Sequence, residues 1–265
     1  SLYGSNTFCL CKFGAGYDWD SHSSRGSTGD YVNTIVRFLI VSDLHANIDA
    51  LNIVLADATG EYDSIVCCGD LVGYNPNPSD IVDWTRTHCA TVIRGNHDKV
   101  IAGIDDLEWF NPVAQISARW TMNQLSPDQM QYLRELPMGP LDLEYFHVFH
   151  GAPFDEDEYI LSLDTARISF EYLQHPVSFF GHSHIQGGFF DRHRHIGVLP
   201  KVPADQHELV IELEADTIYM INPGAVGQPR DGDPRAAYAL YDTDRKLVIL
   251  RRVAYPIEET NQKIK

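Results

Sequence analysis

The strongest constraint on the fold is a series of short apolar stretches that each stop abruptly at Asp, Asn or His. Residues 35–41 are mostly apolar and end at Ser42-Asp43. Such stretches are typical of buried strands, and rigid strand ends can aim side chains from distant sequence positions at one point. The sequence therefore predicts a polar site at the strand ends of a sheet. The pattern recurs at 64–68 before Gly69-Asp70, at 91–93 before Arg94-Gly95-Asn96-His97-Asp98, at 145–149 before His150, and at 177–180 before Gly181-His182-Ser183-His184.

The order of the remaining patterns indicates the fold class. Helical spacing of apolar residues covers 48–58, 78–87, 112–125 and 127–136, whereas 208–213, 218–221, 237–241 and 247–253 are strand-like. Alternating strands and helices followed by strands predict an α+β fold of the α/β type, in which two stacked mixed sheets are flanked by helices. With 265 residues, 44% of them apolar, we expect one enzyme-sized domain over 34–265. Gly and Ser fill 11 of the first 33 positions, so 1–33 is predicted to be an irregular N-terminal extension.

Composition restricts the partners and the compartment. Asp and Glu number 37 against 20 Lys and Arg, a formal net charge of -17, which disfavours long nucleic acids and anionic membranes as partners. Every apolar run falls short of the roughly 20 residues that a spanning helix requires. Ser1–Leu10 lacks the basic start and apolar stretch of a secretory signal, and five unevenly spaced cysteines are typical of reduced thiols. We expect a cytoplasmic protein that uses no membrane, and the sequence leaves its oligomeric state open.

The polar motifs differ in their specificity. Asp-x-His occurs four times, beginning at Asp20, Asp43, Asp191 and Asp205, but only the copy at Asp43 follows a strong strand and precedes a helix. Gly-His-x-His, found at 181–184, is expected only about 0.04 times by chance in a chain of this composition. His, Asp and Asn at strand ends are suitable metal ligands. The ordered set is therefore far more specific than any one motif.

Taken together, Asp-x-His, Gly-Asp, Gly-Asn-His-Asp, His and Gly-His-x-His resemble the motifs of the calcineurin-like metallophosphoesterase superfamily, over about residues 35–254. Gly69–Tyr74 and Asn222–Arg230 are similar to its small prokaryotic phosphodiesterase branch, the YfcE-like one, although Ala225 stands where that branch usually has Ser. The resemblance implies a four-layer αββα sandwich, the metallophosphoesterase fold.

The resemblance also implies two divalent metal ions that share one ligand, Asp70. Their identity is left open among Mn, Fe, Ni and Zn, with Mn expected to serve in vitro, and a hydroxide bridging the ions would attack phosphorus. The implied substrate is a small phosphorylated molecule or nucleotide, as a phosphodiester or a phosphomonoester. The ligands carried over are Asp43, His45, Asp70 and His184 for one ion, and Asp70, Asn96, His150 and His182 for the other.

Beside the metal ligands, the resemblance makes His97 the catalytic imidazole. The carboxylate that orients this ring in many relatives lies three residues after the Gly-Asp aspartate, a position occupied here by Gly73. Asp98 is the substitute that the sequence offers, as a catalytic-site carboxylate. Arg230 and Arg94, together with Asn96, are candidate substrate-binding residues. Tyr74 is a candidate for lining the pocket.

Several alternatives remain within this family. Arg94-Gly95-Asn96-His97 resembles protein Ser/Thr phosphatases, although Gly69–Tyr74 departs from their second motif; a dinucleoside polyphosphate hydrolase and a non-catalytic scaffold are further possibilities. A cysteine phosphatase is excluded because only four residues separate Cys89 from Arg94. For other conspicuous residues we expect no direct role in function. Asp155–Glu158 is predicted to be a solvated loop, and Trp84, Trp109 and Trp120 are predicted to pack in the core. His147 and His175 are expected to have structural or surface roles, and Cys9, Cys11 and His22 do not complete a zinc site.

Overall fold

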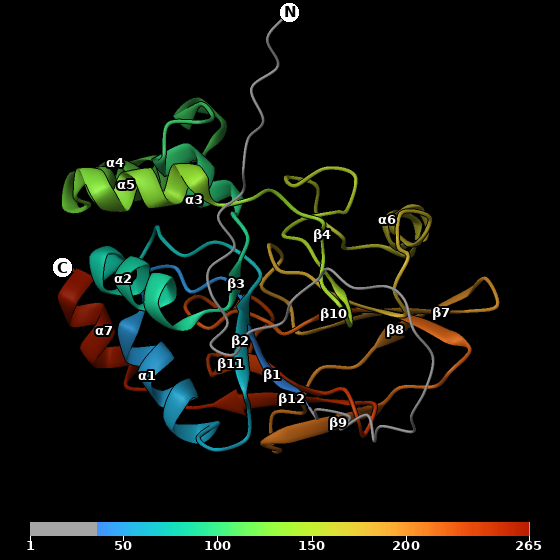
Figure 1. The fold of residues 1–265 in the computed structure, drawn as a ribbon. Coiled ribbons are helices and arrows are strands. Elements are labelled where there is room, and N and C mark those ends of the chain that lie inside the picture. Colours follow the sequence, from blue (N-terminus) through green and yellow to red (C-terminus); the bar gives the residue numbers. More distant parts are fainter. Residues whose placement is uncertain (1–35, 265) are drawn as a thin grey trace, which may run out of the picture. The chain divides into compact units, whose positions relative to one another are not determined.

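The computed structural model describes residues 36–264. The expected extension at 1–33, with Cys9, Cys11 and His22, lies outside the described residues. Within them, two six-stranded sheets form the centre of the fold (Figure 1). Both sheets are mixed, as the sequence predicts.

The first sheet has the strand order β3–β2–β1–β11–β12–β9. β1 pairs in parallel with β2 and antiparallel with β11, and β2 pairs in parallel with β3. The carboxyl ends of β1, β2 and β3 therefore lie at one edge. The strands are β1 (Arg37–Val41), β2 (Ser64–Cys67), β3 (Thr91–Val92), β9 (Glu208–Glu212), β11 (Ala236–Asp242) and β12 (Leu247–Val253).

The second sheet has the order β4–β5–β6–β10–β7–β8. Here β5, β6 and β10 are parallel neighbours, whereas β4, β7 and β8 pair antiparallel. The parallel trio again brings three carboxyl ends together. The strands are β4 (Leu141–Asp142), β5 (His147–Val148), β6 (Val177–Phe179), β7 (Gly187–Arg192), β8 (His195–Leu199) and β10 (Thr217–Asn222).

Helices cover the outer faces of the two sheets. In Figure 1, α1, α2 and α7 lie on the side of the first sheet, and α6 lies on the side of the second. This arrangement is the expected four-layer αββα sandwich. The helices are α1 (Ile48–Asp57), α2 (Pro78–His88), α3 (Asn96–Ile101), α4 (Pro112–Gln124), α5 (Pro127–Glu135), α6 (Leu163–Phe170) and α7 (Ile257–Ile264), with a short 3-10 helix at Leu107–Trp109.

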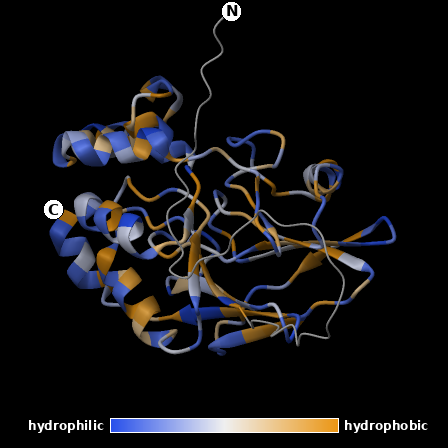
Figure 2. Ribbon diagram, in the orientation of Figure 1, coloured by the Kyte–Doolittle hydropathy of each residue, from blue (hydrophilic) through white to orange (hydrophobic). Residues whose placement is uncertain are grey.

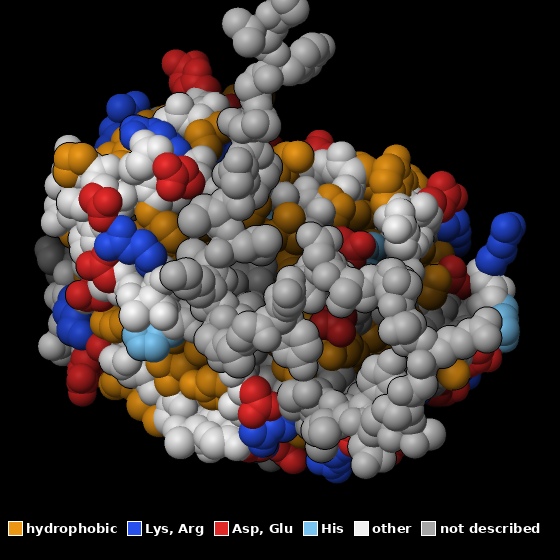
Figure 3. Space-filling model, viewed as in Figure 1, with side chains coloured by type: hydrophobic (Ala, Val, Ile, Leu, Met, Phe, Trp, Pro, Cys, Tyr) orange, Lys and Arg blue, Asp and Glu red, His pale blue; other side chains and the backbone are white. Residues whose placement is uncertain are grey.

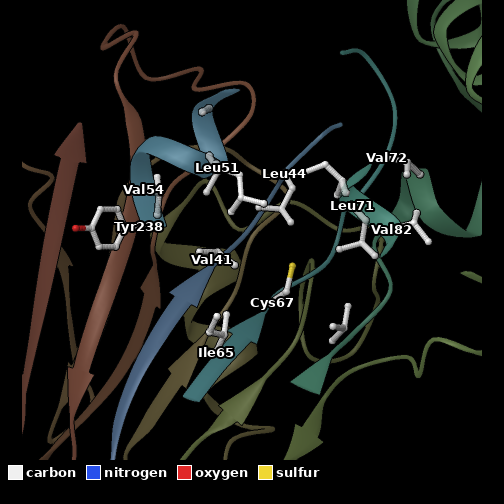
Figure 4. Packing of buried hydrophobic residues seen from close by; sticks show 14 of the residues in the cluster. Val41, Leu44, Leu51, Val54, Ile65, Cys67, Leu71, Val72, Val82 and Tyr238 are labelled. Carbon is white, nitrogen blue, oxygen red and sulfur yellow. The ribbon is translucent and has the colours of Figure 1, made fainter. Parts of the chain in front are cut away.

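The period-two pattern of β1 explains how the layers are held together. Leu39 and Val41 pack with the helix residues Leu51 and Val54 in one apolar cluster, whereas Ile40 packs into a second cluster between the sheets. Figure 4 shows the first cluster, with Leu51 and Val54 of α1 facing the strands. Figure 2 shows apolar residues along the central strands, while the helices carry both apolar and polar residues. Successive strand side chains point to opposite faces, so one buried strand supports two cores.

Several elements go beyond the sequence prediction. The prediction omitted α3, α6, α7 and the strands β4, β7 and β8, and it placed a longer strand at 145–149 than the observed β5. β7 begins with Gly187 and Gly188 and turns through polar residues into the edge strand β8. A half-exposed edge hairpin carries too few buried apolar residues to give a clear period.

Among the described residues, no helix combines the length and apolar character needed to cross a membrane. On the face seen in Figure 3, acidic and basic side chains are interspersed with apolar ones.

Candidate metal centre

All seven expected metal ligands follow the carboxyl ends of parallel strands. Asp43 and His45 follow β1, Asp70 follows β2, and Asn96 follows β3. In the second sheet, His150 follows β5, and His182 and His184 follow β6. Every aspartate and histidine in this set is at least 96% buried. The structure thus brings together residues that are up to 141 positions apart.

The backbone at these positions is strained. Asp43, His45, Asp70, His182 and His184 all have positive φ, between 41° and 65°. Non-glycine residues rarely adopt this conformation, and such strain concentrates at functional sites. Glycine allows the neighbouring loops to approach: a Cβ on Gly95 would lie 2.1 Å from Asp70 Oδ1, and one on Gly181 would lie 2.0 Å from Ser42 Oγ. The glycines in these motifs are therefore needed for close contact between loops.

The first group of ligand atoms comprises Asp43, His45, Asp70 and His184, which lie within 4.8 Å of one another. His184 Nε2 is 3.3 Å from Asp43 Oδ1, and His45 Nε2 is 3.5 Å from Asp70 Oδ2. This is the set that the resemblance implied for one ion.

The second group comprises Asp70, His150 and His182. His150 Nε2 lies 3.4 Å from Asp70 Oδ2 and 3.3 Å from Asn96 Oδ1. Asp70 therefore belongs to both groups, and Asn96 faces the second one.

Hydrogen bonds to backbone carbonyls fix the histidine tautomers. Three of the rings donate from Nδ1. His45 donates to Val72 O at 3.0 Å, His150 to Cys68 O at 2.8 Å and His184 to Gln228 O at 2.5 Å. Each of these rings therefore turns Nε2 toward the cluster. His182 is reversed: its Nε2 donates to Asp157 O at 3.0 Å, which leaves Nδ1 for the cluster. A carbonyl that holds the outer nitrogen in this way is typical of metal-ligating histidines.

The pKa values of these residues reflect the crowding of candidate ligand side chains. Burial alone would raise the pKa of Asp43, but the interaction with His184 outweighs burial and lowers this pKa. In the same way, the interaction with His150 lowers the pKa of Asp70. Burial lowers the pKa of His45 well below its usual range and that of His182 to about 3. Burial opposes protonation of His150 too, yet the charge of Asp70 raises its pKa to about 10. The His150 imidazole is thus held as a cation beside Asp70, whereas His45 and His182 are neutral near pH 7.

Divalent ions fit these residues. With both outer nitrogens donating to carbonyls, the Nε2 atoms of His45 and His184 face each other as acceptors only 3.1 Å apart. Asp43 Oδ2 is buried and has no hydrogen-bond partner among the described residues. Such converging acceptors are costly unless a cation lies between them. Carboxylate oxygens with imidazole nitrogens suit Mn, Fe, Ni and Zn.

His97 lies beside the cluster and is held by aromatic packing. Its ring centroid is 4.8 Å from that of His45, 4.7 Å from Tyr74 and 4.4 Å from Phe110. Its Nδ1 is buried and lacks a partner among the described residues, and a Cβ on Gly73 would lie only 2.6 Å from this atom. Burial lowers the pKa of His97 to about 4.

Asp98 does not take the expected place beside His97. Its Oδ1 accepts hydrogen bonds from the backbone N–H groups of Leu71 (2.9 Å) and Val72 (3.3 Å), and its Oδ2 accepts one from Gly95 (2.9 Å). The carboxylate therefore joins the loop after β2 to the start of α3. Within the described residues, the His97 ring donates no hydrogen bond to a carboxylate, because Gly73 and two aromatic rings occupy its surroundings.

A cavity of about 660 Å³ opens over the cluster. As expected, Tyr74 and Arg230 line it, and the Arg230 guanidinium lies 5.7 Å from the centroid of the Tyr74 ring. Lys99 and Tyr159 also line it; no motif indicated either one. The Tyr159 ring stacks on His182 with a centroid separation of 3.8 Å.

Two expectations about this region, for Arg94 and Trp109, were wrong, and a third holds only in part. Arg94 is not a lining residue, because its guanidinium is held by Glu156 in a two-pronged ion pair at 2.8 and 3.0 Å. Asp155, Asp157 and Glu158 are exposed, as expected for a solvated loop, but Glu156 is largely buried, and Asp157 lines the cavity and pairs with Lys99. Trp109 is 81% exposed at the cavity mouth rather than packed in the core.

Comparison with known proteins agrees with the motifs and the fold. Residues 36–246 match the family model of the calcineurin-like phosphoesterase superfamily domain. An uncharacterized protein of Methanocaldococcus jannaschii is 33% identical over 237 residues, which cover 85% of this chain and 90% of that protein. The crystal structure of a metallophosphoesterase from Sphaerobacter thermophilus is similar with a TM-score of 0.74 and 38% identity, covering 86% of this chain and 92% of that one.

A hypothetical protein from Pyrococcus horikoshii shares the fold at 18% identity, with a TM-score of 0.65 over 86% of this chain and 92% of its own. The family model alone spans most of the chain, and it covers every candidate ligand. The chain belongs to the calcineurin-like phosphoesterase superfamily.

Proposed function

We propose that the protein hydrolyses phosphodiester bonds, and phosphomonoesters as weaker substrates, with two divalent ions bound at the strand-end cluster. The observation that carries this proposal is the pair of buried ligand groups that share Asp70. A carboxylate shared by two groups of acceptors is the arrangement that a two-ion site requires.

The residues would divide between the ions as the two groups divide. Asp43, His45 and His184 hold one ion, Asn96, His150 and His182 hold the other, and Asp70 contacts both. When bound, the ions supply Lewis-acid polarisation of the phosphoryl oxygens and lower the pKa of water, so that hydroxide is available near neutral pH. The chain's own contribution is to fix the ligands on rigid strand ends and to aim one ring nitrogen of each histidine inward, while a backbone carbonyl holds the other nitrogen.

His97 would act directly on the substrate. Its ring lines the cavity and lies beside His45. With the pKa lowered to about 4 by burial, the ring is neutral near pH 7 and carries one N–H. We infer that this N–H is donated to a phosphoryl oxygen or to the leaving oxygen, where charge develops during the reaction.

The cavity supports a small phosphorylated substrate, such as a nucleotide. Its volume of about 660 Å³ is typical of sites for small molecules. Arg230 provides positive charge at the wall, whereas the charge of Lys99 is paired with Asp105 and Asp157. Tyr74, Tyr159 and Trp109 provide flat apolar surfaces that suit a planar group such as a nucleobase. In a chain of net charge -17, two bound divalent ions together with Arg230 would make the cavity locally positive, which favours a compact anion over a polyanionic chain.

The direct test is turnover of bis(p-nitrophenyl) phosphate by the full chain with added Mn²⁺, beside p-nitrophenyl phosphate as the monoester. We expect faster hydrolysis of the diester, loss of activity after dialysis against a chelator, and recovery when Mn²⁺ is returned. Turnover that persists in chelated, metal-free protein would contradict the proposal.

Arg230→Ala is expected to raise KM about tenfold or more with little change in kcat. The guanidinium is exposed at the cavity wall, and within the described part of the chain it forms no ion pair and donates to Gln228 and Tyr74, so it can bind an anion. A hydrogen bond from a charged donor is worth about 1.5–3 kcal/mol, and loss of uniform binding appears in KM. The matched control is Arg167→Ala, which removes an exposed arginine paired with Asp164 outside the cavity. Equal kinetics for the two variants would show that Arg230 does not bind the substrate.

A further inference from the structure

We propose that Asp142, His147 and His175 form a separate binding site for a late first-row divalent cation such as Zn²⁺. These three residues are called the peripheral site below. The site is independent of the proposed phosphoesterase activity, because none of the three residues lines the catalytic cavity or belongs to either ligand group of the catalytic centre.

Two chain segments bring the peripheral site together. Asp142 of β4 and His147 of β5 are direct partners in the antiparallel register of a short hairpin, whose turn is closed by hydrogen bonds between Leu143 and Phe146. Residues that face each other in this way have neighbouring side chains on one face of the sheet. His175 comes from the segment between α6 and β6, two residues before β6 begins. β6 is the other neighbour of β5, and His147 is in register there with Ser178.

The separations of the ligand atoms suit one small cation. One ligand atom from each residue can be chosen so that all lie within 4.8 Å of one another. His175 Nε2 is 2.7 Å from Asp142 Oδ1, and His147 Nε2 is 4.0 Å from the same oxygen. Zn²⁺ with bonds of about 2.0–2.1 Å in a tetrahedron places neighbouring ligand atoms about 3.3 Å apart. The two observed separations bracket this value, and the Asp142 side chain is 68% exposed, so it can adjust by rotation.

His147 provides the observation that points to a missing ligand. The residue is only 6% exposed, and its Nδ1 is buried with no hydrogen-bond partner in the described part of the chain. Its Nε2 is too far from Asp142 for a hydrogen bond, and the His175 ring lies perpendicular to it at a centroid distance of 4.6 Å. A buried imidazole without partners costs free energy. A cation on Nε2 would give that nitrogen a partner, with the ring proton on Nδ1, and would turn the His175–Asp142 contact into two further ligand bonds.

The ligand chemistry selects among cations. Two imidazoles and one carboxylate leave a fourth position for water, as in three-ligand zinc sites. Affinities of nitrogen and oxygen sites rise from Mn²⁺ toward Ni²⁺ and Cu²⁺, with Zn²⁺ also well above Mn²⁺. Zn²⁺ would therefore occupy the peripheral site under conditions in which Mn²⁺ leaves it empty. Bound there, it would tie the β4–β5 hairpin to the segment that leads into β6.

The test counts Zn²⁺ bound per full-length chain after equilibrium dialysis, using elemental analysis on the wild type, His175→Ala and Asp142→Asn. Both altered residues have partly exposed side chains, so the variants are expected to fold. The matched control is His193→Ala, since His193 is an exposed histidine that pairs with Asp216 at 3.1 Å and has no third ligand beside it. Thermal unfolding with and without Zn²⁺ gives a second readout, because a bound ion stabilises the native state.

We expect the two site variants to bind one Zn²⁺ fewer than the wild type and His193→Ala, with phosphoesterase turnover within about twofold of wild type. The affinity lost should be about 100-fold or more, since removal of an outer hydrogen-bond partner alone already weakens metal sites 10- to 100-fold. Zn²⁺ should raise the melting temperature less in the two site variants than in the control. Equal Zn²⁺ counts in all four proteins, or an equal loss in His193→Ala, would overturn the proposal.

Discussion

Asp70→Asn is expected to lower phosphoesterase turnover by about 1,000-fold and to reduce the number of bound divalent ions per chain. Asp70 is the one residue shared by both ligand groups within the described residues. Its Oδ2 lies 3.5 Å from His45 Nε2 and 3.4 Å from His150 Nε2. Removing the charge leaves a neutral ligand between two cations. A loss of about 4 kcal/mol of transition-state stabilisation, in the range ascribed to metal-ion catalysis, corresponds to about 1,000-fold.

The substitution changes charge with little change in shape, so it separates metal binding from folding. Asp70 Oδ1 accepts a hydrogen bond from the backbone N–H of His97 at 2.9 Å, and the amide oxygen of Asn can keep this bond. The control is Asp233→Asn, which alters a largely buried aspartate paired with Arg235 outside the cavity. Elemental analysis and steady-state kinetics on both variants are the measurements. If Asp70→Asn retained both ions and normal turnover, Asp70 would not be the shared ligand.

Gly73→Ala is expected to lower kcat by about 100-fold or more while the bound ions are retained. The new Cβ would lie 2.6 Å from His97 Nδ1, a separation that forces the imidazole to move. The ring is packed between Tyr74 and Phe110, so its displacement changes where its N–H points. Positioned acid-base groups contribute about 100- to 10,000-fold to rate, and a shift of this size removes most of that contribution.

A second glycine supplies the control for backbone strain. Gly103 also has positive φ, 75° against 92° for Gly73, but a Cβ there would meet nothing within 4 Å. Gly103→Ala therefore shares the conformational cost of about 1–2 kcal/mol without contacting His97. Comparison of kcat, metal content and melting temperature for the two variants isolates the contact with the ring. Equal kcat values for Gly73→Ala and Gly103→Ala would remove His97 from the proposed mechanism.

The strand ends that carry the site are well predicted from the sequence, because each strand end depends on a local pattern. A β-branched strand that stops at a polar residue, as at Asp43, carries its own boundary signal, and parallel pairing then brings such boundaries to one edge. The grouping of Asp43 with His184 and of Asp70 with His150 joins residues of two different sheets, and it is what the family resemblance implied. Their function as ligands stays a prediction until ions are measured.

The wall of the cavity depends on pairings that no local pattern encodes. Arg94 is 62 residues from Glu156, and their ion pair removes a cation that the sequence alone leaves free for substrate. Asp98 sits next to His97 in the chain, yet its position in the first turn of α3 turns its carboxylate to the backbone of Leu71. Trp109 lies outside the helices predicted from the sequence, so no period indicates which side of this segment faces solvent. Pairings of this kind arise from tertiary packing, where local propensity has little influence.

The most direct measurement is anomalous diffraction from crystals of the full chain soaked in Mn²⁺. We predict two anomalous peaks on either side of Asp70, roughly 3.5–4 Å apart, one contacting Asp43, His45 and His184 and the other contacting Asn96, His150 and His182. A single peak, or peaks that do not contact Asp70, would contradict a two-ion phosphoesterase centre at these strand ends.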